Sequence, residues 1–302
     1  MINKIKNLYN LFLDYLILKS LKKRFKNYVK SYPIVSGRLF DVQSLNIMLK
    51  GRFENNELIT LKKNIFNKIK SKQNNALDIG ANIGNHTNFF SENFSKVYAF
   101  EPLKENFELL ELNTKSKKNV EIFKYGASSK NQKSTLYTLS NTDTGHSSLM
   151  YSENSNITFD NKETIDLVNL DEFLNIKKIN NIKFVKIDVE GYENEVLKGM
   201  DKLIKKDKPV IALEQLAKNF KDSSTESINF LKKNNYNFFY EPDFEKRKEY
   251  RSKSYRYLLD LMYIFKLVFI RNFNKKHNLK KINEFKVKDY SMIIASQFDL
   301  ES

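Results

Sequence analysis

Cysteine and tryptophan are both absent from this chain of 302 residues. The lack of cysteine excludes disulfide bridges, thiolate metal ligands and a cysteine nucleophile, and it suits a reducing cytosol. No apolar run approaches the about 20 residues that a membrane-spanning helix needs. An apolar stretch over residues 8–18 is interrupted by Asp14, and a basic run follows at 22–24 where a cleavage site would stand. We therefore expect neither a transmembrane helix nor a signal peptide.

The charge is distributed unevenly along the chain. Residues 1–75 carry 16 Lys and Arg against 4 Asp and Glu (net +12), and residues 245–289 carry 14 against 5 (net +9). The middle, residues 76–244, carries 22 against 25 (net −3). Basic surfaces bind nucleic acid, anionic lipid or acidic partners. Because the predicted catalytic region is not basic, the positive flanks predict docking rather than chemistry.

Both flanks contain amphipathic stretches. Apolar residues at helical spacing, with lysines between them, predict a helix over residues 2–30, and a second helix is expected over 57–70. We interpret residues 1–70 as a basic helical extension, and residues 71–302 as a catalytic domain with a basic and apolar insertion at about 245–289. Within the insertion, the apolar segment 255–273 fits an interfacial membrane helix, a protein–protein surface or a helix buried on the sheet.

From residue 75 onward, short apolar runs alternate with helical stretches, which predicts right-handed βαβ units and a mostly parallel sheet. The expected strands are 76–79, 97–100, 120–125, 183–187, 209–213 and 289–296, and the expected helices are 85–91, 105–113, 193–204 and 223–232. Residues 126–182 are expected to be irregular apart from a short β-like run over 134–139.

The most informative motif is the segment 78–85, Asp-Ile-Gly-Ala-Asn-Ile-Gly-Asn. In it, an apolar strand runs into a glycine turn and then into a helix. Gly80 permits a tight turn and the close approach of a ligand, and the helix N-terminus offers free N–H groups. Because the glycines are four apart, the motif is not the dinucleotide fingerprint. It predicts a nucleoside with an amino-acid tail, or alternatively a tight turn without a ligand.

Glu101 strengthens the nucleoside interpretation. It ends the second expected strand, 21 residues after Gly80. In doubly wound folds an acidic residue about 20 positions after the turn reaches the ribose hydroxyls, and a carboxylate accepts both hydroxyl protons. The alternative is a solvent-facing charge at the end of a strand.

At this point the sequence resembles the FkbM-type S-adenosylmethionine (SAM)-dependent methyltransferases. The matching segments lie within roughly 75–215 and are 77–87, 100–102, 145–149, 164–174, 184–193 and 196–199. The resemblance implies a Rossmann-like, class I methyltransferase fold with a seven-stranded, mostly parallel sheet, and methyl transfer from SAM to a hydroxyl. The residues expected to bind SAM are Asp78, Gly80, Asn82, Gly84, Asn85, Glu101 and Ser148.

Asp188 and Glu190 follow the strand 183–187 at the edge where open α/β sheets bind ligands. Strand alternation puts both side chains on one side if the strand geometry persists. A carboxylate there can accept the proton of a substrate hydroxyl, which is a poor nucleophile while protonated. We predict that Asp188 is the catalytic base. Glu190 either contacts the substrate or, like Glu193, serves the N-terminus of the next helix.

Three further side chains are candidates. Glu214 ends the strand 209–213 at the same edge, so Asp188 and Glu214 offer oxygen ligands that suit Mg²⁺ or Mn²⁺. His146 is a second candidate base, since histidine titrates near neutrality, or a hydrogen-bonding loop residue. Ser147 is expected to contact the substrate or to be structural. His86, in the first helix, is expected to be structural.

Together these features predict a SAM-dependent O-methyltransferase that acts on a hydroxyl of a glycan, a glycolipid or a small hydroxylated metabolite. The basic flanks raise an RNA methyltransferase as an alternative. The Asn-Pro-Pro-Tyr-type motif of base-modifying enzymes is absent, so nucleic acid is not the expected partner. A non-catalytic scaffold would not need to retain Asp78, Gly80, Glu101 and Asp188. The flanks predict a cytoplasmic protein attached peripherally to an anionic membrane face.

Overall fold

The computed structural model describes residues 15, 19, 35–37, 43–44, 46–47, 51–138, 147–148, 161–243 and 277–301. Apart from Tyr15 and Lys19, which are helical, the segment predicted as a helix over 2–30 lies outside these ranges, and so does all of 255–273. Within the described ranges, no helix has the length and hydropathy to cross a bilayer.

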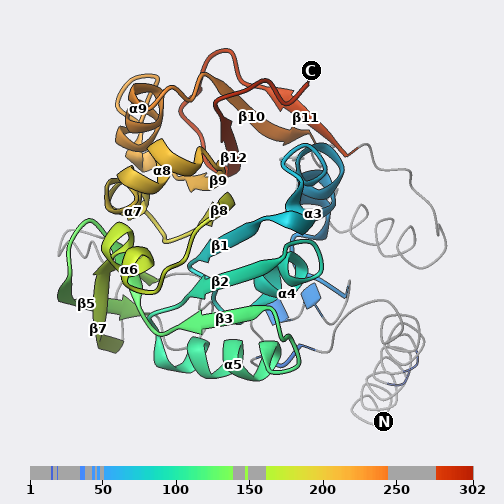
Figure 1. The fold of residues 1–302 in the computed structure, drawn as a ribbon, viewed down its shortest axis with the longest axis vertical. Coiled ribbons are helices and arrows are strands. Elements are labelled where there is room, and N and C mark those ends of the chain that lie inside the picture. Colours follow the sequence, from blue (N-terminus) through green and yellow to red (C-terminus); the bar gives the residue numbers. More distant parts are fainter. Residues whose placement is uncertain are drawn as a thin grey trace, which may run out of the picture.

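The main sheet has eight strands in the order β11-β10-β12-β9-β8-β1-β2-β3 (Figure 1). Neighbouring strands are parallel from β9 to β3, while β12, β10 and β11 pair antiparallel. The parallel strands are β1 (Asn75–Ile79), β2 (Lys96–Phe100), β3 (Val120–Phe123), β8 (Ile182–Ile187) and β9 (Val210–Gln215). The antiparallel strands are β10 (Phe238–Asp243), β11 (Asn278–Lys281) and β12 (Tyr290–Ser296). Strand order reverses between β1 and β8, the switch point at which such sheets bind ligands.

The Rossmann-like class is confirmed, but the predicted strand number, seven, was one too low. The extra strand, β11, lies at the sheet edge in the polar segment Asn-Leu-Lys-Lys, where no apolar alternation marks a strand. Residue patterns also missed β10, in which a short aromatic run over 238–240 is followed by Glu241 and Pro242.

Helices cover both faces of the sheet. They are α3 (Asn55–Leu61) with the π-helical turn η1 (Lys62–Phe66), α4 (Asn85–Ser91), α5 (Lys104–Thr114), α6 (Leu170–Ile176), α7 (Glu193–Gly199), α8 (Asp201–Asp207) and α9 (Glu226–Lys233), with short 3₁₀ turns η2 (Ser71–Gln73) and η3 (Ala217–Asn219). The prediction of a single helix over 193–204 was wrong, because the helix is interrupted at Met200, between α7 and α8. Gly199, which precedes the break, packs so tightly that a Cβ would lie 1.9 Å from the Ser128 carbonyl oxygen.

One sheet face is closed by α3, η1 and α4. Phe66 lies at the centre of an aromatic cluster, with ring centroids 4.8 Å from Phe94 and 5.4 Å from Phe184. Leu58 and Leu61 are fully buried in the same cluster. Residues 58–66 therefore pack into the sheet core, although the predicted domain boundary at residue 70 stays a prediction.

A second sheet has four strands, in the order β4-β7-β5-β6: β4 (Gly126–Ser128), β7 (Asn161–Asn169), β5 (Gln132–Thr138) and β6 (Ser147–Ser148). The β-like run expected over 134–139 corresponds to β5, but the expectation that the rest of 126–182 is irregular was wrong. Most side chains of β7 are polar, and only Ile165 and Leu167 are buried, so the strand looks like a loop in the sequence. These two residues pack with Leu103 and Tyr192, which follow β2 and β8. The small sheet therefore lies beside the carboxyl edge of the main one (Figure 1).

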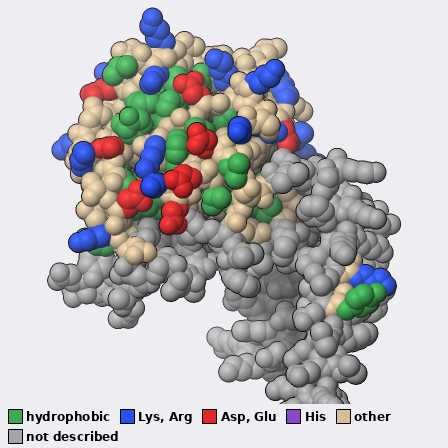
Figure 2. Space-filling model, turned by 90° about the horizontal axis from the view of Figure 1, so that it is seen from below, with side chains coloured by type: hydrophobic (Ala, Val, Ile, Leu, Met, Phe, Trp, Pro, Cys, Tyr) green, Lys and Arg blue, Asp and Glu red, His purple; other side chains and the backbone are tan. Residues whose placement is uncertain are grey.

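Acidic and basic side chains are interspersed on the face of the described residues that Figure 2 shows. This mixture agrees with the small net charge of residues 76–244. Much of the basic excess belongs to the segments before residue 51 and within 244–276, most of which lie outside the described residues.

Candidate functional site

The turn after β1 and the residue after β8 are in direct contact. Gly80 has φ +76°, and a Cβ on it would lie 1.8 Å from the Asp188 carbonyl oxygen. The Asp188 N–H donates to the Ile79 carbonyl over 3.0 Å. Glycine is required at position 80 because the backbone of Asp188 crosses the turn there. This requirement holds whether or not a ligand also approaches the turn. The two signature segments of the sequence are thus two sides of one site.

Gly84 and Asn82 complete the turn. Gly84 has φ +87°, and a Cβ there would meet Leu110 of α5 at 2.8 Å, so this glycine permits the contact between α4 and α5. Asn82 has φ +49°, a conformation that asparagine tolerates better than most residues. Its side-chain oxygen is buried and has no hydrogen-bond partner among the described residues. The turn therefore presents an unused acceptor.

Glu101 is almost fully buried and closes the turn from the end of β2. One carboxylate oxygen accepts from the Asn82 N–H over 2.9 Å, and the other accepts from the Leu103 N–H over 3.0 Å. Burial raises the pKa of Glu101 to about 7, although these backbone hydrogen bonds oppose the shift. The oxygen bonded to Leu103 also accepts from the Asn106 side-chain amide over 3.4 Å, so the oxygen bonded to Asn82 keeps a lone pair that is compatible with the predicted bond to a ribose.

Asp78 and Lys186 form a buried network beneath the turn. Asp78 is fully buried and accepts a 2.6 Å hydrogen bond from the Thr87 hydroxyl of α4. Lys186 Nζ lies 3.4 Å from Asp78 Oδ1 and 3.2 Å from Asp188 Oδ2, and it donates to the Gly80 carbonyl over 2.8 Å. Burial alone would lower the pKa of Lys186, but the two carboxylates outweigh it and raise the pKa. The predicted contact of Asp78 with SAM stays a prediction.

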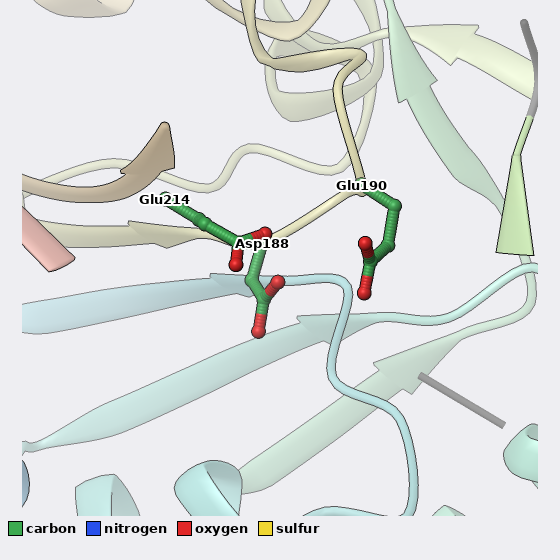
Figure 3. Close-up of side chains that lie close together, drawn as sticks. All are labelled: Asp188, Glu190 and Glu214. Atoms are coloured by element: carbon green, nitrogen blue, oxygen red, sulfur yellow. The ribbon is translucent and has the colours of Figure 1, made fainter. Parts of the chain in front are cut away.

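Asp188, Glu190 and Glu214 bring three carboxylates together, each with an oxygen within 4.8 Å of the others (Figure 3). The predicted proximity of Asp188 and Glu190 is correct, but the reason given for it was wrong. Strand β8 ends at Ile187, and Glu190 has φ +52°. A left-handed loop, not the alternation of a strand, turns Glu190 toward Asp188.

Two of these carboxyl groups are strongly perturbed. Burial, with Asp188 and Glu193 nearby, raises the pKa of Glu190 to about 8. Burial, with Asp188 and Glu190 nearby, raises the pKa of Glu214 to about 9. Near neutral pH both glutamates therefore carry a proton and can donate hydrogen bonds. The same oxygens have the character of ligands for a hard divalent cation.

Glu193, rather than Glu190, serves the N-terminal turn of α7. Its carboxylate accepts from the Gly191 N–H over 2.9 Å. The residue that precedes α7, Tyr192, makes no side-chain cap. Glu193 therefore closes the turn, and Glu190 faces the carboxylate cluster.

Sequence patterns missed the loop of residues 51–54. The Asn85 amide bonds both backbone groups of Phe53, accepting from its N–H over 3.1 Å and donating to its carbonyl over 3.0 Å. Glu54 has φ +49° and lies 3.2 Å from His86 Nε2. Asn85 therefore holds this loop on α4, while its predicted bond to SAM stays a prediction. His86 is buried, in the structural position expected of it.

Glu54 is part of the electrostatics of the site. Its charge raises the pKa of Lys186 and that of Glu214, which places it near both. No periodicity or motif marks Glu54 in the sequence, and although Lys186 lies within the matching segment 184–193, no role was predicted for it. A further signal was the position of Lys186 in β8, where a charged residue is flanked by apolar neighbours.

The remaining predicted residues lie in or next to the small sheet. His146 lies outside the described residues. Ser147 and Ser148 form β6, paired with Thr138 and Tyr137 of β5. Their expected contacts with substrate and SAM stay predictions.

Comparison with known proteins gives one family match and one curated relative. The model of the methyltransferase FkbM domain matches residues 78–238. Hexuronic acid methyltransferase AglP of Haloferax volcanii is 31% identical over 124 residues, which cover 41% of this chain and 48% of the relative. The chain thus spans about half the length of the curated relative that it matches.

Solved structures resemble the chain only loosely. Methyltransferase FkbM from Methylobacillus flagellatus has a TM-score of 0.34 and 21% identity, over 48% of this chain and 33% of the other. Precorrin-6y C5,15-methyltransferase from Geobacter metallireducens has a TM-score of 0.37 and 14% identity, over 79% and 86% of the two chains. The fold class follows from the strand order of this chain itself.

Proposed function

The chain belongs to the FkbM methyltransferase family, and we propose on that premise that it transfers a methyl group from SAM to a hydroxyl of a glycan or glycan-like molecule. One observation carries the proposal: the glycine turn expected to hold SAM touches the backbone of Asp188, the expected base. The similarity to a methyltransferase named for hexuronic acid supports a sugar as the acceptor.

The residues of the turn fit SAM. The unused oxygen of Asn82 can accept from the ammonium group of the methionyl tail. Glu101, at the end of β2, is placed to accept from the ribose hydroxyls. Asn82, Glu101 and the N-terminus of α4 would hold the cofactor, which supplies an electrophilic methyl group on a positively charged sulfur.

Asp188 is the proposed base. Lys186 holds one oxygen of Asp188 at 3.2 Å, which leaves the other to take the proton of the acceptor hydroxyl. The deprotonated acceptor oxygen would then take the methyl group that bound SAM supplies. Protonated Glu190 and Glu214 are placed to donate hydrogen bonds that orient the acceptor. A positioned base of this kind contributes about 10²–10⁴-fold.

Alternatively, the same carboxylate cluster binds a divalent cation. Asp188 and Glu214, joined by Glu190, would coordinate Mg²⁺ or Mn²⁺ through oxygen atoms. Binding would release protons from the two glutamates, because carboxylate ligands must be ionised. Loss of turnover with a chelator and its recovery with Mg²⁺ would favour this version. Turnover unaffected by the chelator would exclude it.

The test is methyl transfer from tritium-labelled SAM into cell extracts separated into polysaccharide, lipid and RNA pools. We expect label in a carbohydrate-bearing pool, in a form stable to mild alkali, because an ether withstands conditions that cleave a methyl ester. Alkali-labile label would identify a carboxyl group as the acceptor. Label confined to RNA would contradict the proposal and support the RNA alternative.

A further inference from the structure

Lys186 is a charged side chain buried to 5% exposure in the central strand β8. Its ammonium group lies within 3.4 Å of three groups: the Gly80 carbonyl, Asp78 and Asp188. Burying an ammonium group costs roughly several kcal/mol unless the group is paired with an opposite charge and hydrogen-bonded. Lys186 has a carboxylate partner on each side of the site, Asp78 on β1 and Asp188 after β8.

These contacts join elements that are distant in sequence. Gly80 belongs to the turn after β1, and Asp188 follows β8. Asp78 is in turn bonded to Thr87 of α4. Thus one ammonium group fixes the turn expected to hold SAM, the helix behind it and the carboxylate that faces the acceptor.

We propose that Lys186 is a positioning residue, which sets the orientation of the Asp188 carboxylate relative to the glycine turn; this inference rests on the proposed function. Lys186 touches neither the transferred methyl group nor the acceptor. It acts by holding Asp188 Oδ2, which fixes the direction in which the other carboxylate oxygen, Oδ1, points. The competing account is that Lys186 only neutralises the buried charge of Asp78.

Substitutions at positions 78 and 186 separate these accounts. Lys186→Gln removes the ammonium group but keeps a donor for the Gly80 carbonyl. On its own it leaves Asp78 buried without its cation, so it is expected to lower the melting temperature. Asp78→Asn combined with Lys186→Gln removes one charge of each sign, and the amide oxygen that Asp78→Asn introduces can still accept from the Thr87 hydroxyl. The double variant therefore restores the charge balance beneath the turn without restoring the cation beside Asp188.

Lys183→Gln is the matched control, because Lys183 lies on the same strand and donates to the Asp207 backbone carbonyl, away from the site. For each variant, melting temperature, SAM affinity by calorimetry, and kcat and KM for methyl transfer into the carbohydrate pool are measured. We expect the double variant to regain the melting temperature of the Asp78→Asn variant. Its kcat should stay about 10–100-fold below that of Asp78→Asn, the order of magnitude known for outer-shell partners that orient metal ligands.

The outcomes are distinct. Recovery of kcat together with stability in the double variant would overturn the inference, because Lys186 would then only balance Asp78. Wild-type kcat in Lys186→Gln would overturn it as well. A wild-type protein that binds no SAM would refute the proposed function, and with it the reaction that Lys186 is proposed to serve.

Discussion

At the scale of single residues, the site combines a tight backbone contact, two glutamates with raised pKa values and a buried lysine. The backbone carbonyl of Asp188 approaches Gly80 so closely that no side chain fits at position 80. Glu190 and Glu214 retain protons at neutral pH because burial and neighbouring carboxylates disfavour their ionisation. A single buried cation, Lys186, joins Asp188 to the turn.

Asp188→Asn tests the base directly. The substitution keeps the shape of the side chain and removes the proton acceptor. Turnover should fall about 10²–10⁴-fold while calorimetry finds SAM affinity unchanged. Wild-type turnover in this variant would remove Asp188 from the mechanism.

Glu101→Ala tests the ribose contact. SAM affinity should weaken by about 1–3 kcal/mol, the cost of leaving hydrogen-bonding groups unpaired. Affinity for SAM should also fall in the wild type as the pH drops below about 7, because Glu101 then gains a proton and loses acceptor capacity. Identical calorimetric affinities for Glu101→Ala and the wild type would place the ribose elsewhere.

The raised pKa values of Glu190 and Glu214 also predict a pH-dependent stability. In the unfolded chain both ionise near the ordinary value of 4.5, whereas in the folded protein they ionise near 8 and 9. Their contribution is thus fully present below pH 4.5 and is lost as the pH rises toward 9. Glu190→Gln combined with Glu214→Gln should raise the melting temperature at pH 9 and change it less at pH 6. An equal change at both pH values would contradict the assigned shifts.

Residue types alone located much of this site. Asp78, Gly80, Glu101, Asp188, Glu190 and Glu214 all lie at the carboxyl edge of the sheet, where the strand pattern placed them. Lys186 and Glu54 could not be found in the same way, because a lysine or a glutamate acquires a role from neighbours that only the folded chain supplies. The contact of Asn85 with Phe53 likewise depends on a loop 32 residues earlier.

At the scale of elements, a strand could be predicted from the sequence where it contains a run of apolar residues. Five parallel strands and β12 were recognised because they are rich in apolar residues, and all of them except the edge strand β3 are mostly buried. Of the small sheet only the run within β5 was predicted, because β5 and β7 bury few side chains. Its packing against Leu103 and Tyr192 cannot be read from either strand alone.

The loop 51–54 and helix α4 form one unit whose stability can be measured. Asn85→Ala leaves the N–H and carbonyl of Phe53 unpaired, so the free energy of unfolding should fall by about 1–3 kcal/mol in denaturant titration. Asn180→Ala is the control, since that exposed side chain makes a 3.3 Å bond to the nearby Lys178 carbonyl. If Asn85→Ala instead weakens SAM binding and leaves stability unchanged, the predicted cofactor role of Asn85 is correct.

At the scale of the whole molecule, the basic flanks remain to be given a partner. We propose peripheral attachment to an anionic membrane that carries the acceptor, on the basis of the net charges of +12 and +9 around a middle of −3. Each basic residue near an anionic surface contributes about 1 kcal/mol.

Sedimentation with vesicles tests the attachment. Binding to anionic but not neutral vesicles is expected, and it should weaken in about 1 M salt, where screening acts within about 3 Å. A protein that ignores anionic vesicles yet binds RNA with a steep salt dependence would contradict the membrane proposal.

The central claim, that the turn 80–84 and Asp188 form the two halves of a methyl-transfer site, is tested most directly by a crystal structure with S-adenosylhomocysteine bound. We predict the ribose hydroxyls on Glu101, the amino-acid tail beside Asn82 and the sulfur facing the space bounded by Asp188 and Glu190. A ligand bound away from the carboxyl edge of β1 and β2, or with its sulfur turned away from Asp188, would contradict the account.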